Sequence, residues 1–383
     1  MPTNLITSNL ITGSPVIGAP ELGLFSILQT APLIAGAPVI GRPKIATFHP
    51  WTIPVNWDGG ITEEVAYRTE VIVSRDGTEQ RIAQRVNPRY MFRFGVLVGR
   101  ERAAELERLL VKRQAFDYRF PHPRRSTLED RSHPAAAGFT GRFDRDPVVI
   151  ARTDRVLSFE VAVQVNPGVY PGDYLAAYTH PAADTFHNGL EVFTLRPNWA
   201  EQVRLTFSQM REILDLQRGV TDFNAPESFT KRMIQCQIMI RNEAQENRLR
   251  GLFERMRGQQ GEFYMADPLS AQIAPTSAIT AGSSSITVSG PQVFQRFADE
   301  ATYRNIAIRT RTGMLYRKIS AITLVGGNSR IGLTTTLPAI LASDLIGVQW
   351  LLRMRFAADT LVFGWETDVV ARCTINLRSL EDV

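Results

Sequence analysis

MFRFGVLVG at residues 91–99 and MIQCQIMIR at residues 233–241 are the stretches that decide the fold. In both, every second residue is apolar and most of the residues between are Arg, Gln or Gly; the apolar positions are Phe92, Phe94, Val96 and Val98, and then Ile234, Cys236, Ile238 and Ile240. This alternation is typical of strands with one buried and one exposed face, as in antiparallel sheets. Because the two stretches match position for position, the sequence predicts a duplicated strand.

Each of these strands is followed by the pattern of an amphipathic helix. The apolar stripe of the second helix has the spacing i, i+3, i+4, i+7 and consists of Leu249, Leu252, Phe253 and Met256. The stripe of the first consists of Ala103, Leu106, Leu109 and Leu110. An aromatic segment then closes each copy, FDYRFPHP at 116–123 and EFYMADP at 262–268. Two copies of strand, helix and strand are therefore expected.

Two shorter signals precede each strand at matching places. Asn56-Trp57 stands at the same distance before the first strand as Asn198-Trp199 before the second. The turn segment SRDG at 74–77 is matched in the same way by LQRG at 216–219. We take Trp57 and Trp199 as candidate interaction residues.

Together these patterns predict a mainly β fold with α+β repeats. We expect two tandem β-sandwich or barrel units, each flanked by one helix: the first over 48–140 with its helix at 100–114, the second over 191–268 and 351–383 with its helix at 243–257. Residues 141–190 read as connecting β segments and loops. Short β runs separated by Gly and Ser predict a small inserted β domain at 269–350, a barrel or sandwich rather than helices.

A third, partial copy ends the chain. The spacing of Val203, Leu205 and Phe207 returns in Cys373, Ile375 and Leu377. We expect this last strand to complete the second unit. By the same logic, residues near Val203 are expected to complete the first unit while opening the second, so that the two units share an edge.

Residues 1–47 contain a shorter repeat of their own. GSPVIGAP at 13–20 returns as GAPVIGRP at 36–43. Prolines placed two residues after glycines forbid a regular helix and remove donors from a central strand, so an extended arm is expected. Its apolar side chains, with Val16, Ile17, Val39 and Ile40 as candidate interaction residues, need another surface. That surface belongs to a neighbouring subunit or to the body of this chain; the alternative is a disordered tail.

The composition excludes several classes of protein. The 383 residues are 44% hydrophobic and 21% charged, enough apolar content to bury a core, and 43 Lys and Arg against 38 Asp and Glu give a net charge of +5. The apolar run near 28–45 is interrupted by Pro32, Pro38 and Pro43, so no membrane-spanning helix is expected, and no secretory signal is recognisable. Cys236 and Cys373 occupy apolar alternating positions, where buried thiols are expected.

The sequence offers little for catalysis. The motifs of nucleophile elbows, phosphate loops, zinc proteases and dinucleotide sites are missing. His180, Asp184 and His187 in HPAADTFH have a spacing that could hold a metal, but a fourth ligand is lacking and a solvated loop explains them as well. Basic residues are interleaved with acidic ones, which favours a structural role over nucleic-acid recognition. We expect no catalytic residue, no cofactor and no metal.

The run SRDGTEQRIAQRVNPRYMFRFGVLV at 74–98, the helix with its LERLL core and the FDYRF closure resemble tail proteins of tailed bacteriophages. The closing segment RMRFAADTLVFGWETDVVARCTINLRSLED at 353–382 is similar to the end of the same proteins. The resemblance covers most of residues 50–383. The arm matches only a looser class of phage repeat.

The resemblance implies a virion structural component at the tail tip, of the distal tail or baseplate hub type, made in the host cytoplasm. Such proteins have a β-sandwich flanked by one helix and form rings that continue the tail tube. The doubled unit departs from a single-copy ring subunit and implies a homo-oligomeric ring of three or six chains. The implied partners are the tail tube protein and hub and fibre proteins, with viral DNA passing through the lumen without specific binding.

Other functions remain open at this point. One is a receptor- or carbohydrate-binding tail-tip module that uses the inserted β domain. Another is a different tail protein, such as a minor tail or adaptor protein. The third is a hydrolase that uses His180 or His187.

Overall fold

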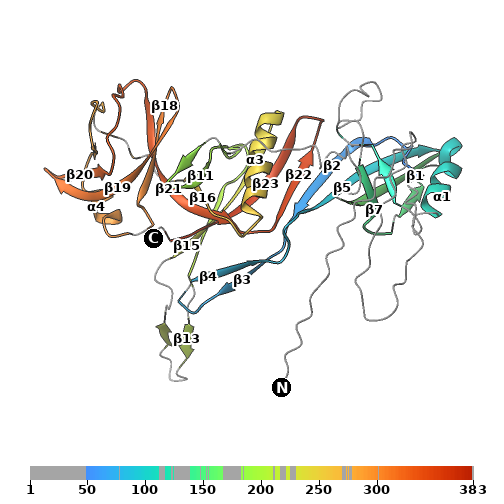
Figure 1. Cartoon of the computed structure of the whole chain (residues 1–383), viewed down its shortest axis with the longest axis horizontal. Helices are drawn as coiled ribbons and strands as arrows, with labels where there is room; N and C mark the ends of the chain where they lie inside the picture. Colours follow the sequence, from blue (N-terminus) through green and yellow to red (C-terminus); the bar gives the residue numbers. More distant parts are fainter. Residues whose placement is uncertain are drawn as a thin grey trace, which may run out of the picture. The chain divides into compact units, whose positions relative to one another are not determined.

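The computed structural model describes residues 49–76, 78–111, 117–121, 124, 139–146, 148–151, 153, 155–166, 183, 185–209, 212–215, 221–224, 230–269, 273, 275, 278–300 and 302–381. Over these residues the chain is mainly β, as predicted, with one large sheet and two separate hairpins (Figure 1). The candidate residues Val16, Ile17, Val39 and Ile40 lie outside the described residues.

The first repeat is built around the long strand β5 (Arg89–Gly99), which carries the predicted alternation. β5 pairs on one side with β2 (Asn56–Ala66) and on the other with β9 (Val156–Val165). The remaining elements of this repeat are β1 (His49–Pro50), β3 (Thr69–Val73), β4 (Glu79–Ala83), η1 (Arg100–Arg102), α1 (Ala103–Val111), β6 (Tyr118–Phe120), β7 (Phe139–Phe143) and β8 (Val149–Ala151).

The second repeat is built in the same way around β15 (Lys231–Ile240). β15 lies between β12 (Arg204–Ser208) and β23 (Ala371–Ser379). The other elements of this repeat are β11 (Leu190–Phe193), β13 (Glu212–Asp215), β14 (Thr221–Asn224), α3 (Glu243–Met256), β16 (Phe263–Ala266), the second half of β21 (Leu345–Phe356) and β22 (Thr360–Trp365). A short β10 (Phe186–His187) pairs with β11.

The two repeats agree residue by residue in their strand register. Glu63 pairs with Phe92 in the first repeat, and their counterparts Leu205 and Ile234 pair with each other in the second. All seven pairings between the described strands of the first repeat recur in the second. The separation in sequence between counterparts grows from β5 to β6 and again from β6 to β7, yet the pairing is unchanged. The register of the strand pairs is therefore the same in both repeats, although the segments between the strands differ in length.

Two expectations about the strands were wrong. Residues near Val203 do not complete the first repeat, because β12 pairs only with β15 among the described strands. β9 completes it instead, and β7 and β8 also pair within the first repeat although they were expected to connect the units. The sequence of β9 does alternate, with Phe159, Val161 and Val163 among its apolar positions, but such an alternation predicts a strand without telling which strand it pairs with.

The helices lie where their apolar stripes predict. In α3, Leu249, Leu252 and Phe253 are buried, and Asn242 caps the helix by accepting a hydrogen bond from the Gln245 amide at 2.9 Å. In α1, Leu106 and Leu109 are buried. The expected helix at 100–114 begins with η1, and its described part ends at Val111.

The inserted region is a small barrel. β17 (Ser285–Val288), β20 (Asn328–Leu333), β19 (Met314–Val325), β18 (Asn305–Thr310) and the first half of β21 pair in that order. Two isolated bridges, Ile273 with Val348 and Pro275 with Val288, return the pairing to its start. Contrary to the expectation of strands alone, a short helix α4 (Gln292–Phe297) follows Pro291, a residue that suits helix starts.

The register of β5 predicts which core residue matters most in the first repeat. Phe92 is fully buried and stacks on Phe139 with ring centroids 4.9 Å apart. We expect Phe92→Ala to lower the free energy of unfolding by about 3–5 kcal/mol. Urea unfolding followed by fluorescence would measure this. The exposed Val86→Ala should change it by less than about 0.5 kcal/mol, and equal effects of the two changes would contradict the assigned core.

Candidate assembly interface

The two repeats are joined by backbone pairing. β22 of the second repeat pairs antiparallel with β2 of the first, from Ile61 opposite Trp365 to Ala66 opposite Thr360 (Figure 1). β2 thus lies between β5 and β22, and a single sheet passes from one repeat into the other. The junction between the repeats is therefore an interface between two copies of this unit within one chain.

Four charged side chains are buried at this junction. Glu63 and Arg124 come from the first repeat, and Glu246 and Arg250 lie one turn apart on α3. Arg124 holds Glu246 with two hydrogen bonds, of 2.7 and 3.1 Å, while Arg250 contacts Glu63 at 2.8 Å and Glu246 at 3.0 Å. Two carboxylates and two guanidiniums balance, which is the condition under which charges can be buried without a large net cost.

Aromatic rings of β22 cover this charge cluster. The guanidinium of Arg124 lies 3.5 Å from the ring centre of Trp365, and that of Arg250 lies 4.8 Å from the ring centre of Phe363. The indole Nε1 of Trp365 donates a hydrogen bond to Glu63 at 3.1 Å. Cation–π contacts of this kind strengthen when water is excluded, so the cluster ties β2, β22 and α3 together.

The β3–β4 hairpin forms a second contact between the repeats. Glu79 accepts a hydrogen bond from Arg355 at 2.8 Å and lies 3.3 Å from Arg378, both on strands of the second repeat. Arg81 is bonded to Glu262 and donates to the Gln260 carbonyl oxygen at 3.0 Å. The hairpin of the first repeat therefore covers arginine side chains of the second.

Neighbouring arginines lower the pKa of the two glutamates in this hairpin contact. Burial by itself would raise the pKa of Glu79, but Arg355, Arg378 and Lys231 outweigh it and hold that pKa below its ordinary value. Glu262 behaves likewise, since Arg81 and Arg353 hold its pKa low against the effect of burial. Both carboxylates are ionised wherever the hairpin is docked near neutral pH.

The two tryptophans of the Asn-Trp pairs occupy equivalent places but differ in environment. In the first repeat Asn56 pairs with Gly95. In the second, the backbone N–H of Asn198 donates to the carbonyl oxygen of Gln237, the counterpart of Gly95, at 2.7 Å. Trp57 is partly buried against the core, whereas Trp199 is 62% exposed. Of the predicted interaction residues that the structure describes, Trp199 is thus the one available to a partner.

The histidine constellation is only partly visible. His180 and Asp184 lie outside the described residues. His187, on β10, has its Nε2 2.7 Å from the Asn305 side-chain oxygen and its ring against Tyr264. It therefore links the second repeat to the inserted barrel. Within the described ranges, no group of three His, Cys, Asp or Glu side chains could hold a metal ion.

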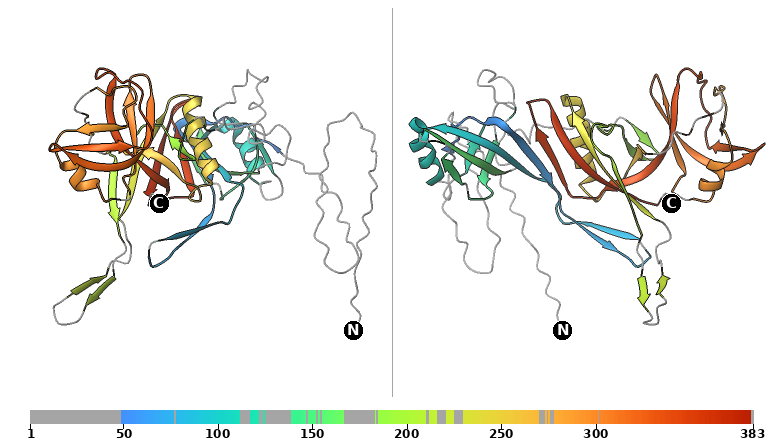
Figure 2. Two further views of the ribbon diagram at one scale, coloured as in Figure 1. Left: turned by 60° about the vertical axis from the view of Figure 1, so that its left-hand side comes forward. Right: turned by 180° about the vertical axis from the view of Figure 1, so that it is seen from behind.

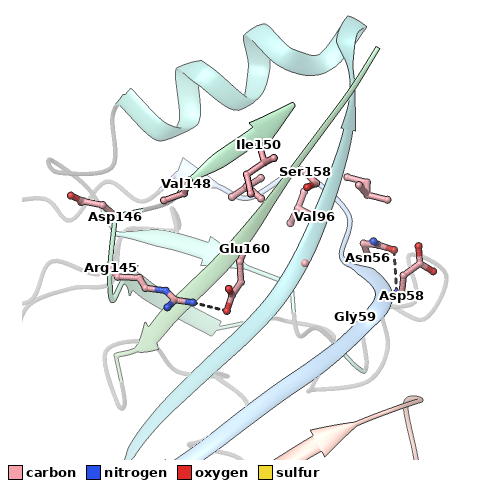
Figure 3. Close-up of a pocket in the computed structure, with 13 residues that line it drawn as sticks. Asn56, Asp58, Gly59, Val96, Arg145, Asp146, Val148, Ile150, Ser158 and Glu160 are labelled. Atoms are coloured by element: carbon pink, nitrogen blue, oxygen red, sulfur yellow. Dashed lines mark hydrogen bonds and ion pairs between the residues drawn. The ribbon is translucent and has the colours of Figure 1, made fainter. Parts of the chain in front are cut away.

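A cavity of about 560 Å³ lies in the first repeat beside β8 (Figure 3). Arg145 and Glu160 form an ion pair of 2.6 Å at one end, and Asn56 binds the Asp58 amide at the other. Val148 and Ile150 add apolar surface. Ser158 is the hydroxyl in the lining, and the residues that line the cavity include no histidine or lysine.

The sequence matches no protein-family profile and no curated protein. None of the helices in the described part of the chain is long and apolar enough to cross a membrane.

The junction cluster predicts an asymmetric response to mutation. Glu63→Leu leaves a buried excess of positive charge and should lower the free energy of unfolding by about 3–5 kcal/mol, whereas adding Arg250→Met should recover most of that loss. Thermal unfolding of the single and double variants would measure it. At the exposed pair of Arg145 with Glu160, Glu160→Gln should cost less than about 1 kcal/mol. A double variant no more stable than the single one would contradict the account.

The hairpin contact predicts a loss of stability in acid. Because the pKa values of Glu79 and Glu262 are depressed below 4.5 in the folded state, their contribution is complete above about pH 4.5 and is lost as the pH falls through the folded-state values. The melting temperature should therefore fall less steeply with acid in the double variant Glu79→Gln, Glu262→Gln than in the wild type. Identical slopes would show that this contact does not carry the acid dependence.

Proposed function

We propose that this chain is a structural component of a bacteriophage tail tip, of the distal tail or baseplate hub type. In this role it forms a ring that continues the tail tube and attaches other tip or fibre proteins. The observation that carries the proposal is the in-register duplication: two copies of one strand-and-helix unit, joined side by side through a shared sheet. The resemblance of residues 74–98 and 353–382 to phage tail proteins supports the same role.

A duplicated unit with open sheet edges suits a closed ring. Each repeat presents one edge to its neighbour, and the junction inside the chain already uses one such pair of edges, β2 with β22. Unused edges are a liability, because their free backbone groups invite aggregation. A ring in which every repeat meets the next removes that liability, and heterologous contacts that close produce such rings. Three or six chains would complete the annulus.

The charge distribution also suits a tube wall. Several arginines of the described residues form ion pairs with carboxylates, such as Arg145 with Glu160 and Arg372 with Glu366. DNA passing through a lumen should not be held, and phosphate binding requires unmatched basic charge. The proposal therefore gives the chain a structural rather than a catalytic role, with residues 1–47 reaching a neighbouring tail protein.

The proposal predicts the mass of the purified chain and its place in the particle. Light scattering of the full chain should give three or six copies, and negative-stain images should show a ring. Mass spectrometry of purified particles should detect the chain, and gold-labelled antibodies should mark the tail tip. A monomer at every concentration tested, or particles that lack the chain, would overturn the proposal.

A further inference from the structure

We propose that the second repeat of one copy docks on the first repeat of the next copy in the way that the first repeat docks on the second within the chain. This inference rests on the proposed ring and names its subunit interface. It would pair β12 of one copy with β8 of the next, and it would place the β13–β14 hairpin on Arg142. The occupant of both surfaces is therefore a second copy of this chain.

The strand edges carry the first step. β8 is the counterpart of β22: Val149 pairs with Phe159 on β9, and Phe363 pairs with Cys373 on β23. Phe159 and Cys373 are themselves counterparts, because β9 and β23 hold the same register on β5 and β15. β12 is likewise the counterpart of β2. Within the chain β2 and β22 pair with each other, but among the described strands β12 pairs only with β15 and β8 only with β9. The same pair of strand edges thus occurs twice in the chain. The edges of β2 and β22 are paired with each other, whereas those of β12 and β8 have no partner strand among the described strands.

The register of β2 with β22 predicts the register of β12 with β8 of the next copy. Inside the chain Glu63 lies opposite Phe363. The counterpart of Glu63 is Leu205, and that of Phe363 is Val149. The same arrangement therefore places Leu205 opposite Val149 of the next copy. A shift of one residue would turn the side chains to the wrong faces, so this register is specific.

Residues on the free strand edges are more exposed than their counterparts at the junction, as expected of an interface that has no partner in the single chain. Phe363 is fully buried at the junction, whereas its counterpart Val149 is 41% exposed. Tyr118 and Phe263 are counterparts, and Arg124 and Leu269 each lie six residues after them. The side chain of Arg124 is 1% exposed, whereas Leu269 is 37% exposed. The apolar residues Val148 and Ile150 are also exposed along β8. These surfaces become buried when the next copy is added.

The junction inside the chain and the proposed contact between copies differ in their charged residues. Glu63 and Arg124 of the charge cluster correspond to Leu205 and Leu269. When Leu106, Leu109 and Leu110 are matched to Leu249, Leu252 and Phe253, Ala103 takes the place of Glu246 and Glu107 that of Arg250. Burying a charge cluster between separate copies would require desolvating ions at each association. Three of the four counterparts are apolar and associate without that cost, which suits a contact between subunits.

The hairpins give an independent second contact. β13 and β14 pair in the same register as β3 and β4, so Asp215 opposite Thr221 corresponds to Val73 opposite Glu79. In the first hairpin the acidic residue of this pair is Glu79 on β4, and in the second hairpin it is Asp215 on β13. In Figure 1 the strand β13 is drawn below the other labelled strands, and Figure 2 shows two further views of the chain.

The surface that would receive the second hairpin carries two exposed arginines, of which Arg142 is bonded to Asp117 of the same repeat. Glu79 binds Arg355, whose side chain is 2% exposed, and Arg355 corresponds to Arg142, whose side chain is 70% exposed. Lys231, buried under the first hairpin, corresponds to the exposed Arg89. An acidic hairpin from the next copy meets this pair of arginines with complementary charge.

Cysteine pairing in the full chain tests the register. Residues directly opposite in antiparallel strands lie about 4.5–5.5 Å apart, within the range that a disulfide spans. The double variant Leu205→Cys, Val149→Cys should form intermolecular disulfides on mild oxidation, giving a ladder on a non-reducing gel that ends at the number of chains in the ring. The control Leu205→Cys, Ile150→Cys places the second thiol on the opposite strand face and should cross-link poorly. Native thiols should not interfere, since burial raises the pKa of Cys236 to about 12 and also raises that of Cys373.

Charge reversal tests the hairpin contact without relying on thiols. Asp215→Arg should weaken self-association at least about tenfold, as should Arg142→Asp, and the two changes combined should restore it. Asp222 gives the matched control, because it is paired with Leu214 and not with Asp215. Asp222→Arg should therefore leave association unchanged. Sedimentation velocity would measure all four variants.

The outcomes separate the interface from the ring. A wild-type ring that neither cross-links through Leu205→Cys and Val149→Cys nor responds to Asp215→Arg would overturn this interface and leave the proposed ring standing. A chain that stays monomeric, with no specific cross-link, would overturn both.

Discussion

The backbone pairing of β2 with β22 is the constraint on which the rest of the structure depends. It places the first repeat beside the second, brings α3 over β2 and so allows Glu63, Arg124, Glu246 and Arg250 to neutralise one another away from water. Without the strand pairing, each of these charges would have to be solvated separately. With it, the cluster favours one relative placement of the repeats, because few other arrangements bring opposite charges into contact inside an apolar junction.

The repeats also show which properties survive duplication. Strand register is kept across all seven pairings, yet side chains in equivalent places have diverged, as in Glu63 and Leu205 or Trp365 and Ala151. Hydrogen bonding between backbones does not depend on side-chain identity, so it tolerates substitution. Side chains instead record what each copy contacts: charges where the partner is tethered in the same chain, and apolar residues where the edge is open.

Much of the fold was predictable from local patterns, whereas the junction was not. Phe92, Phe94 and Val96 gave the period of a half-buried strand, and Leu249, Leu252 and Phe253 gave the helix stripe, because each pattern repeats within a few residues. β9 was misjudged because its alternating sequence predicts a strand but not the strand with which it pairs. The charge cluster joins residues from Glu63 to Arg250, and apart from Glu246 and Arg250 no spacing links them. Such long-range pairs become visible only when the sheet is assembled.

The continuity of β21 has a mechanical consequence. Its twelve residues belong at one end to the inserted barrel and at the other to the second repeat, and His187 with Asn305 gives a second attachment nearby. Two attachments, one of them an unbroken strand, leave no pivot at which the barrel could swivel freely. A force applied to the barrel would therefore pass along β21 into β23 and β15, the central strands of the second repeat.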